Sequence, residues 1–296
     1  MCAEYSTKGI VDLHEHAGPS VAPRSVDAFE MFEQTKAAGW AGFVLKEHYM
    51  PTTALAEQIN KHLRTSDSDP VAFGCLCLNN SIGGLNTVAI DAAYCAGVKV
   101  ICLPTVSALN HLNHHKTKFS GSGDMVSVEK PIYLLDESGK LTQAAKDVLT
   151  FLGERPELLV MTGHISVEEI NEVVPFALNA GVKNLLVNHP HYEIGANTDD
   201  MKRWAEAGAY IELNACVFEG ISRKTAVPLT VAAEMMEAVP EDKFILDGDL
   251  GQKHNDPPVI CLPRFIGFLR DRLGVSDAYL DKVVKENPAK LVGLVK

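Results

Sequence analysis

This sequence lacks three features, and each absence excludes a class of protein. No run of about 18 consecutive apolar residues occurs in the chain, so no segment is a candidate for a membrane-spanning helix. The N-terminal residues lack a basic region followed by an apolar stretch, so we expect a cytoplasmic protein. Dense runs of Lys and Arg are also absent. The 27 basic and 38 acidic side chains give a net charge of −11, which argues against a nucleic acid or an anionic membrane surface as partner.

Disulfide and zinc-finger patterns are missing as well. The seven cysteines are odd in number, and most lie within apolar segments such as FGCLCLN and KVICLP. We therefore expect reduced, buried thiols. Cys75 and Cys77 could bind a metal together, but no second CxC or CxxC accompanies them, so core packing is the favoured role.

What the sequence does contain is a regular alternation of short apolar runs and amphipathic helical stretches. With 46% hydrophobic and 22% charged residues, the composition is that of a globular protein with enough apolar side chains for a large core. Eight apolar runs have the length and the residue types of buried strands. They comprise residues 9–14, 42–48, 71–78, 98–104, 158–164, 184–189, 209–214 and 243–249.

Eight strands separated by helices over about 250 residues predict a parallel (β/α)8 barrel, or TIM barrel. We expect it to form a single domain over residues 1–296, with extra helices at the C-terminus. Several helical stretches end in Ala-Gly just before the next strand, and Ser166 with Glu169 forms a capping box. A doubly wound sheet is the alternative, but no GxGxxG phosphate loop follows the first strand.

One connection in this pattern is far longer than the others. Residues 105–140 separate the fourth strand from the next helix, where a handful of residues would suffice. Alternating apolar residues in the stretches MVSV and IYLL, on either side of a turn, predict a β-hairpin. An insertion after a barrel strand lies on the catalytic face, so we expect this one to act as a lid.

The first strand ends in two histidines one residue apart, followed at once by Gly18 and Pro19. Strand alternation would place His14 and His16 on the same face as Ile10, so their imidazoles would converge. Neutral imidazoles are ligands for zinc and similar divalent ions. An isolated pair of this kind is more often found in an exposed loop, so the interpretation depends on the other strands.

The carboxyl ends of the other strands supply that context, because the active site of a barrel lies at these ends. The fifth strand ends at His164, the sixth at His189 and the eighth at Asp249. Each of these residues alone would be interpreted as structural. Four imidazoles and one carboxylate directed at a common centre are, however, the donor set of a catalytic metal site. Asp247 is an alternative ligand, but Asp249 is preferred because it lies at the strand tip.

At this point the chain resembles the amidohydrolase superfamily of metal-dependent hydrolases. The resemblance covers nearly the whole length, from DLHEH through TGH, NHPH and DGDLGQ to ENPAKLVGL. It implies that His14 and His16 hold the more buried metal. It also implies that His164 and His189 hold a second metal or the substrate carbonyl, and that Asp249 binds metal and transfers a proton.

The chain departs from this family at the fourth strand. Dinuclear members usually supply a bridging carboxylated lysine or a glutamate there, but this strand ends CLPT. The second strand offers a substitute, because Lys46 and His48 share a face with Val44 and should both point into the barrel mouth. A carbamate on Lys46 could bridge two metals. As an ammonium, Lys46 would instead pair with a substrate carboxylate or with Asp249, and both alternatives stay open. His48 is then a candidate proton carrier.

Three further residues are candidates for substrate binding. Arg24 follows the first metal motif and could bind a substrate carboxylate, although a surface arginine beside a helix is an equal alternative. His191 follows the sixth strand. His111 lies on the expected lid with His114 and His115, where solvated histidines are the default and substrate contact is the minority case.

Together these residues predict an enzyme with one or two divalent ions, zinc first, with manganese or iron as alternatives. A metal-activated water would hydrolyse an amide, cyclic amide or lactone bond of a small carboxylated metabolite, with Asp249 as the proton acceptor. We expect a homo-oligomer that binds neither nucleic acid nor membrane.

Three rival functions remain open at this stage. The missing fourth-strand bridge is compatible with a mononuclear lyase, decarboxylase or hydratase of the same superfamily. A phosphoesterase of the polymerase-and-histidinol-phosphatase type is a second rival, because KEH after HEH resembles its early motifs, but a terminal Asp-x-His is absent. A metal-binding protein without activity is disfavoured by the presence of His164 and Asp249.

Overall fold

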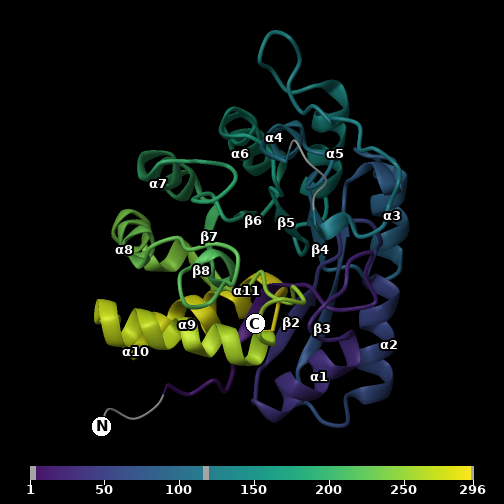
Figure 1. The fold of residues 1–296 in the computed structure, drawn as a ribbon. Helices are drawn as coiled ribbons and strands as arrows, with labels where there is room; N and C mark the ends of the chain where they lie inside the picture. The colour runs from purple at the N-terminus through teal and green to yellow at the C-terminus, as the bar shows by residue number, and fades with distance from the viewer. Residues whose placement is uncertain (1–4, 116–119, 295–296) are drawn as a thin grey trace.

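Eight parallel strands form a nearly closed barrel in the computed structural model, which describes residues 5–115 and 120–294 (Figure 1). The strands pair in chain order, so the predicted (β/α)8 barrel is confirmed. Every predicted strand is present, although most are shorter than expected. The strands are β1 (Val11–Glu15), β2 (Gly42–Leu45), β3 (Val71–Cys77), β4 (Val100–Cys102), β5 (Leu159–Met161), β6 (Asn184–Val187), β7 (Tyr210–Asn214) and β8 (Phe244–Asp247).

Helices alternate with the strands and surround the barrel (Figure 1). The predicted capping box is confirmed, because Ser166 and Glu169 exchange side-chain hydrogen bonds with each other's backbone. No helix of the described residues is long and apolar enough to cross a membrane. The α-helices are α1 (Ala28–Ala37), α2 (Thr53–Leu63), α3 (Thr87–Cys95), α4 (Leu109–His114), α5 (Gln143–Gly153), α6 (Val167–Ala180), α7 (Thr198–Ala207), α8 (Leu229–Ala238), α9 (Pro258–Leu273), α10 (Asp277–Asp281) and α11 (Asn287–Val292).

The barrel is closed between its first and last strands by few contacts. An isolated bridge joins Glu15 to Leu250, and the His16 backbone N–H donates to the Leu250 carbonyl at 2.8 Å. The Asp12 carboxylate adds a side-chain contact across the same seam by accepting the Gly248 N–H at 3.3 Å. The ends of β1 and β8 are thereby held side by side.

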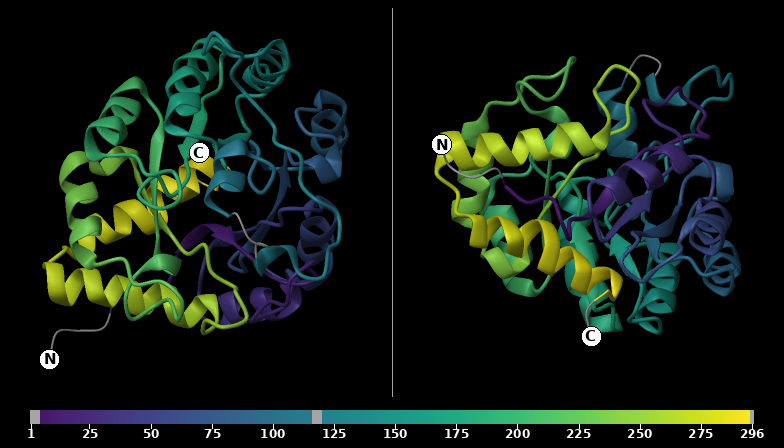
Figure 2. Two further views of the ribbon diagram at one scale, coloured as in Figure 1. Left: turned by 45° about the horizontal axis from the view of Figure 1, so that its top comes forward. Right: turned by 90° about the horizontal axis from the view of Figure 1, so that it is seen from below.

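The interior of the barrel is apolar near the start of the strands. Side chains from all eight strands pack together there, among them Val11, Val44 and Ile245. Leu291 of α11 packs against the same cluster, so α11 covers the amino-terminal mouth of the barrel. The right-hand view of Figure 2 shows the C-terminal helical segment reaching the lower edge of the molecule. A cavity of about 400 Å³ lies at the opposite, carboxyl end of the strands.

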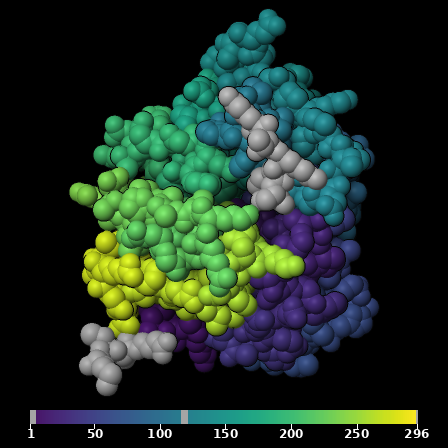
Figure 3. Space-filling view, viewed as in Figure 1, coloured from purple at the N-terminus to yellow at the C-terminus, as the bar shows by residue number. Residues whose placement is uncertain are grey.

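The connection between β4 and α5 is long, as predicted, but the hairpin expected within it is not confirmed. Val126 and Val128, which were expected in a strand, are 95% and 89% exposed, so their alternation has no apolar partner to pack against. This insertion forms the top of the molecule (Figure 3). Residues 116–119 lie outside the described residues. The rest contains α4, a 3₁₀ turn at residues 120–122, and isolated bridges between Ala108 and Ile132 and between Leu135 and Leu141.

The prediction of buried, reduced cysteines is correct for most of them. Cys75, Cys102 and Cys261 are examples of free and buried thiols. Cys95 is exposed instead, because it lies at the end of α3 on the solvent side, and Cys216 is half-buried beside the cavity. Cys2, also expected to be buried, lies outside the described residues.

Candidate metal centre

A β-bulge in β1 turns its histidines toward the cavity. Simple alternation would separate His14 from Leu13, yet Leu13 packs inside the barrel and His14 also faces inward. The register between β1 and β2 shifts between Asp12 and Glu15, and the Asp12 carboxylate accepts the His14 backbone N–H at 2.9 Å. Bulges commonly redirect side chains at active sites. The rings of His14 and His16 converge, with centroids 5.4 Å apart, but the bulge rather than plain alternation brings them together.

Both imidazoles are fixed through their Nδ1 atoms. His14 Nδ1 lies 3.0 Å from Glu212 Oε1, and His16 Nδ1 lies 2.9 Å from the carbonyl oxygen of Lys46. Because a carboxylate and a carbonyl only accept, each Nδ1 carries a proton and donates it, and each Nε2 is left to face Asp249. The two Nε2 atoms lie 3.4 Å and 3.1 Å from the same atom, Asp249 Oδ1.

The contacts of Asp249 Oδ1 with His14 and His16 have the length expected between neighbouring ligand atoms of one ion. Zinc bonds of ~2.0–2.1 Å imply that neighbouring ligand atoms lie roughly 3.3 Å apart. The two distances to Asp249 Oδ1, 3.1 Å and 3.4 Å, bracket this value. Burial and the nearby Arg24 lower the pKa of His16 to about 3, so its ring is neutral, as a ligand must be. His14, His189 and Asp249 also place one possible ligand atom each within 4.8 Å of one another.

Two of the predicted ligands have unusual backbone conformations. Asp249 has a φ of +46° and His189 a φ of +24°, and among the described residues these are the only non-glycine residues with positive φ. Such strain persists only where the surroundings enforce it, and it is concentrated at functional sites. Gly251 allows the chain after Asp249 to approach His16 closely, because any Cβ there would overlap the carbonyl oxygen of His16.

The carboxylate of Asp249 presents one oxygen to the histidines. Its Oδ2 faces Asn214 Nδ2 at 3.3 Å and Cys216 Sγ at 3.4 Å, and both groups donate. Its Oδ1 therefore remains for His14 and His16. Burial would raise the pKa of Asp249, but the histidines outweigh burial and hold the pKa well below its usual range. The side chain is an anion at neutral pH.

Glu212 on β7 accepts hydrogen bonds from two of the predicted ligands, His14 and His189. Its Oε1 accepts from His14 Nδ1 and Asn188 Nδ2, both at 3.0 Å, and its Oε2 accepts the His189 backbone N–H at 2.7 Å. Burial opposes ionisation, but His14, His189 and Lys46 outweigh burial and lower the pKa of Glu212 to about 2. His189 Nδ1, by contrast, has no hydrogen-bond partner in the described structure, although it is buried. An unsatisfied buried nitrogen is costly, and an ion or a substrate would satisfy it.

Lys46 lies among these ligand atoms. Its Nζ is 2.9 Å from His14 Nε2, and its side chain is 1% exposed. Burial lowers the pKa of Lys46, but the Cys102 sulfur and the carboxylates of Asp249 and Glu212 outweigh burial and raise it. As an ammonium, Lys46 donates to the same lone pair of His14 that an ion would use. An ion and a charged Lys46 therefore compete for one atom, and the carbamate and the ammonium both stay predictions.

His164, the predicted ligand from the fifth strand, belongs to a second group of side chains. Its Nδ1 lies 2.9 Å from His111 Nδ1 and 3.6 Å from Glu193 Oε2. Glu193 Oε2 lies 3.1 Å from His111 Nδ1, and Glu193 Oε1 lies 2.6 Å from His115 Nε2. His111 was expected to be solvated or to touch substrate, but it is 1% exposed because α4 folds it against the end of β5.

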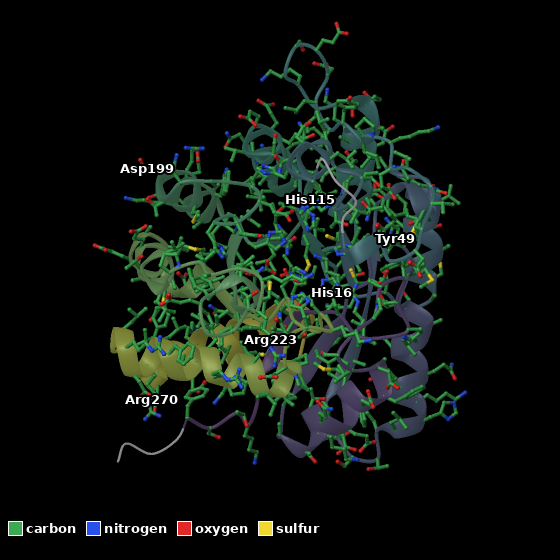
Figure 4. All side chains as sticks on the ribbon, viewed as in Figure 1. His16, Tyr49, His115, Asp199, Arg223 and Arg270 are labelled. Atoms are coloured by element: carbon green, nitrogen blue, oxygen red, sulfur yellow. The ribbon has the colours of Figure 1, made fainter. Side chains whose placement is uncertain are left out.

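The cavity lies between the two groups, and Figure 4 shows His16 and His115 close to the middle of the molecule. His48, the predicted proton carrier, also lines the cavity, and its Nδ1 is 2.9 Å from Thr105 Oγ1. Burial lowers the pKa of His48 well below its usual value, so the ring is neutral. Other lining residues are His164, His189, Tyr192, Glu193, Cys216, Lys224, Asp249 and His254.

Of the three residues predicted to bind substrate, only Arg24 borders the cavity. Its Nη2 lies 3.3 Å from Glu47 Oε2, and its Nε donates to Ser20 Oγ at 2.9 Å, so part of its charge is already paired. His191 does not line the cavity, because its ring turns away and stacks on Phe218 with centroids 5.5 Å apart. His111 lies behind the cavity wall.

Three residues of the site, Glu212, Glu193 and Cys216, were not predicted from the sequence. Glu212 had a detectable signal, because a carboxylate on the inward face of the buried strand 210–214 needs a partner. Glu193 and Cys216 had none, since both lie in connections whose paths the sequence does not specify.

Comparisons with known proteins identify one family that matches the sequence and several solved structures with a similar fold. A model described as "Family of unknown function (DUF6282)" matches residues 9–212. No curated protein matches the sequence. An amidohydrolase from Pseudomonas aeruginosa has a similar structure, with a TM-score of 0.64 and 12% identity over 97% of this chain and 96% of that chain. The metallopeptidase dipeptidase AC also has a similar structure, with a TM-score of 0.63 and 10% identity over 97% of this chain and 98% of that chain.

A third similar structure is a provisionally named 2-pyrone-4,6-dicarboxylic acid hydrolase from Pseudomonas putida. Its TM-score is 0.57, with 12% identity over 97% of this chain and 98% of that chain. At such low identities the likeness shows the fold alone. The barrel fold that the resemblance to the amidohydrolase superfamily implied is confirmed.

Proposed function

The chain belongs to the DUF6282 family, and from its geometry we propose that it is a metal-dependent hydrolase of a small carboxylated substrate. One observation carries the proposal. The Nε2 atoms of His14 and His16 converge on Asp249 Oδ1 beside a cavity, while their Nδ1 atoms are fixed by acceptors. This is how proteins orient imidazoles toward an ion.

The ion would be held by His14, His16, Asp249 and His189. Their three nitrogens and one oxygen favour zinc, with manganese or iron as alternatives. Such an ion supplies Lewis acidity, which makes hydroxide available near neutral pH and polarises a carbonyl. The unsatisfied Nδ1 of His189 and the shared focus of the other three ligand atoms support its presence.

Asp249 would accept the proton of the attacking water. Its pKa lies well below the usual range, so the carboxylate is ionised when the water arrives. Asn214 and Cys216 hold the carboxylate in place through Oδ2, and the accepted proton would then pass to the leaving nitrogen or oxygen. Neutral His48, at the cavity wall, would assist that second transfer.

The substrate would be an amide, a cyclic amide or a lactone with a carboxylate group. A cavity of about 400 Å³ suits a small molecule. Arg24 and Lys224 border it and would attract an anion. The similar structures are named for an amidohydrolase, a dipeptidase and a pyrone dicarboxylic acid hydrolase, which supports these bond types.

A mononuclear lyase or decarboxylase is the second candidate. Lys46 favours it, because its pKa is raised and an ammonium cannot bridge two ions. Such an enzyme would use the same ion to stabilise a developing anion without adding water.

The test is a chelator-sensitive assay combined with metal analysis. We expect hydrolysis of at least one carboxylated amide, cyclic amide or lactone, lost with a chelator and restored by zinc or manganese. The double variant of His14→Ala and His16→Ala should lose both activity and the tightly bound ion. Full metal content in that variant would contradict the site, and release of carbon dioxide or of an unsaturated product would favour the lyase.

A further inference from the structure

We propose that the insertion completes a second transition-metal site, formed by His111, His164 and Glu193 with His115 beside them. The inference goes beyond the proposed function, because none of these residues is assigned to the first ion there. His111 comes from α4, His164 from the end of β5, and Glu193 from the connection between β6 and α7. Three parts of the chain that are distant in sequence thus place ligand groups at one point.

The distances among the three ligand atoms match a metal polyhedron. His111 Nδ1, His164 Nδ1 and Glu193 Oε2 are separated by 2.9 Å, 3.1 Å and 3.6 Å. Ligand atoms around a tetrahedral zinc lie roughly 3.3 Å apart, so the three edges scatter around the ideal value. The same three residues place their ligand atoms within 4.8 Å of one another.

Hydrogen bonds alone account poorly for this arrangement. A single N–H on His111 Nδ1 would have to serve both His164 Nδ1 at 2.9 Å and Glu193 Oε2 at 3.1 Å. These two acceptors would also face each other at 3.6 Å. One cation would satisfy all three atoms at once.

The second site is separate from the first. The ring of His48 lies between them, with centroid distances of 4.9 Å to His16 and 5.7 Å to His164. The ring of His189 lies between them as well, 5.7 Å from His14 and 5.1 Å from His164. An ion in the first site and an ion in the second site would share no ligand. A carbamate on Lys46 is therefore not needed to hold the second ion.

The position of the site gives the second ion two roles. His115, His164 and Glu193 line the cavity, so the ion would face a bound substrate and could bind its carboxylate. It would also attach α4, and with it the insertion, to the barrel. The site would therefore bind a divalent transition metal, and this metal would in turn bind an anionic oxygen of the substrate.

The experiment compares metal content among matched variants. His111→Ala and Glu193→Gln are the site variants, and His114→Ala is the control, because His114 is an exposed neighbour on the same helix. Each protein is depleted of metal, reloaded with zinc, dialysed and analysed for zinc per chain. Circular dichroism verifies folding, and the near-isosteric Glu193→Gln keeps the test informative if the alanine variant unfolds.

We expect about two equivalents of zinc in the wild type and in His114→Ala, and about one in each site variant. The double variant of His14 and His16 should lose the other equivalent, so failure of the first site and failure of the second are distinguishable. The proposal is overturned if His111→Ala and Glu193→Gln, both folded, retain the wild-type zinc content. A wild type with one equivalent that only the His14 and His16 changes remove would overturn it equally.

Discussion

Replacement of Glu212 by glutamine tests whether the hydrogen bonds behind the ligands determine metal affinity. Three N–H groups converge on this carboxylate, from His14, Asn188 and the His189 backbone. An amide of the same size has only one accepting atom, so at least one N–H loses its partner. The least costly orientation keeps the oxygen toward His14 and turns the NH₂ toward the backbone of His189. That backbone is already strained, with a φ of +24°.

The expected loss in zinc affinity is about 10- to 100-fold, which is typical for removal of such a supporting group. In free energy this equals about 1.4–2.8 kcal/mol. Competition with a chromophoric chelator measures the affinity. Glu206→Gln is the control, because Glu206 is exposed on α7. Unchanged affinity in Glu212→Gln would refute the argument that Glu212 orients His14 and His189.

The same variant makes a prediction about acid stability. The pKa of Glu212 is lowered to about 2 in the folded protein, against about 4.3 for an unperturbed glutamate. A depressed pKa means that the carboxylate stabilises the fold above the unfolded value and that this stabilisation is lost as the pH falls toward 2. In urea unfolding of the metal-free proteins, the difference in unfolding free energy between wild type and Glu212→Gln should be constant above about pH 5 and should shrink below it. A difference that grows on acidification would contradict the assigned ionisation.

Three further outcomes follow from the site and its backbone. Asp249→Asn should keep the fold and lose about 10²- to 10⁴-fold in turnover, since an amide cannot accept the water's proton; near-normal rates would move that role to another group. Lys46→Ala should lose one metal equivalent, partly restored by short carboxylates, if Lys46 is a carbamate. If Lys46 is an ammonium, the variant should keep its metal and show a raised KM for anionic substrates. Gly251→Ala should cost more in unfolding free energy than Gly139→Ala, because both have positive φ but only the former adds a collision with His16; equal costs would argue against close packing there.

The sequence was sufficient to predict the barrel and the ends of its strands. Each strand was marked by a short apolar run, and His14, His16, His164, His189 and Asp249 all lie at the carboxyl ends, where the barrel topology requires them. These inferences succeeded because they depend on local patterns and on one rule about where active sites lie in this fold.

Local sequence patterns did not predict which of these residues lie close together in the fold. His164 faces His111 and Glu193 rather than pairing with His189, because the insertion folds back over the barrel. The bulge in β1 was equally hidden, because no local pattern indicates that the register shifts here or that the Asp12 carboxylate accepts the His14 backbone N–H. The hairpin expected in residues 125–135 was not confirmed for the opposite reason, because Val126 and Val128 carry the local pattern but have no apolar surface to pack on.

The seam between β1 and β8 gives the first metal site a mechanical consequence. Only an isolated bridge and a few hydrogen bonds join the two strands, yet His14 and His16 lie on one side of the seam and Asp249 on the other. An ion bound there would act as a cross-link between the beginning and the end of the barrel, and it would restrict a loop that comprises about four-fifths of the chain. Loss of the ion would then open the barrel along this line first. Amide hydrogen exchange at Gly248 and His16 would accelerate before exchange anywhere else in the sheet.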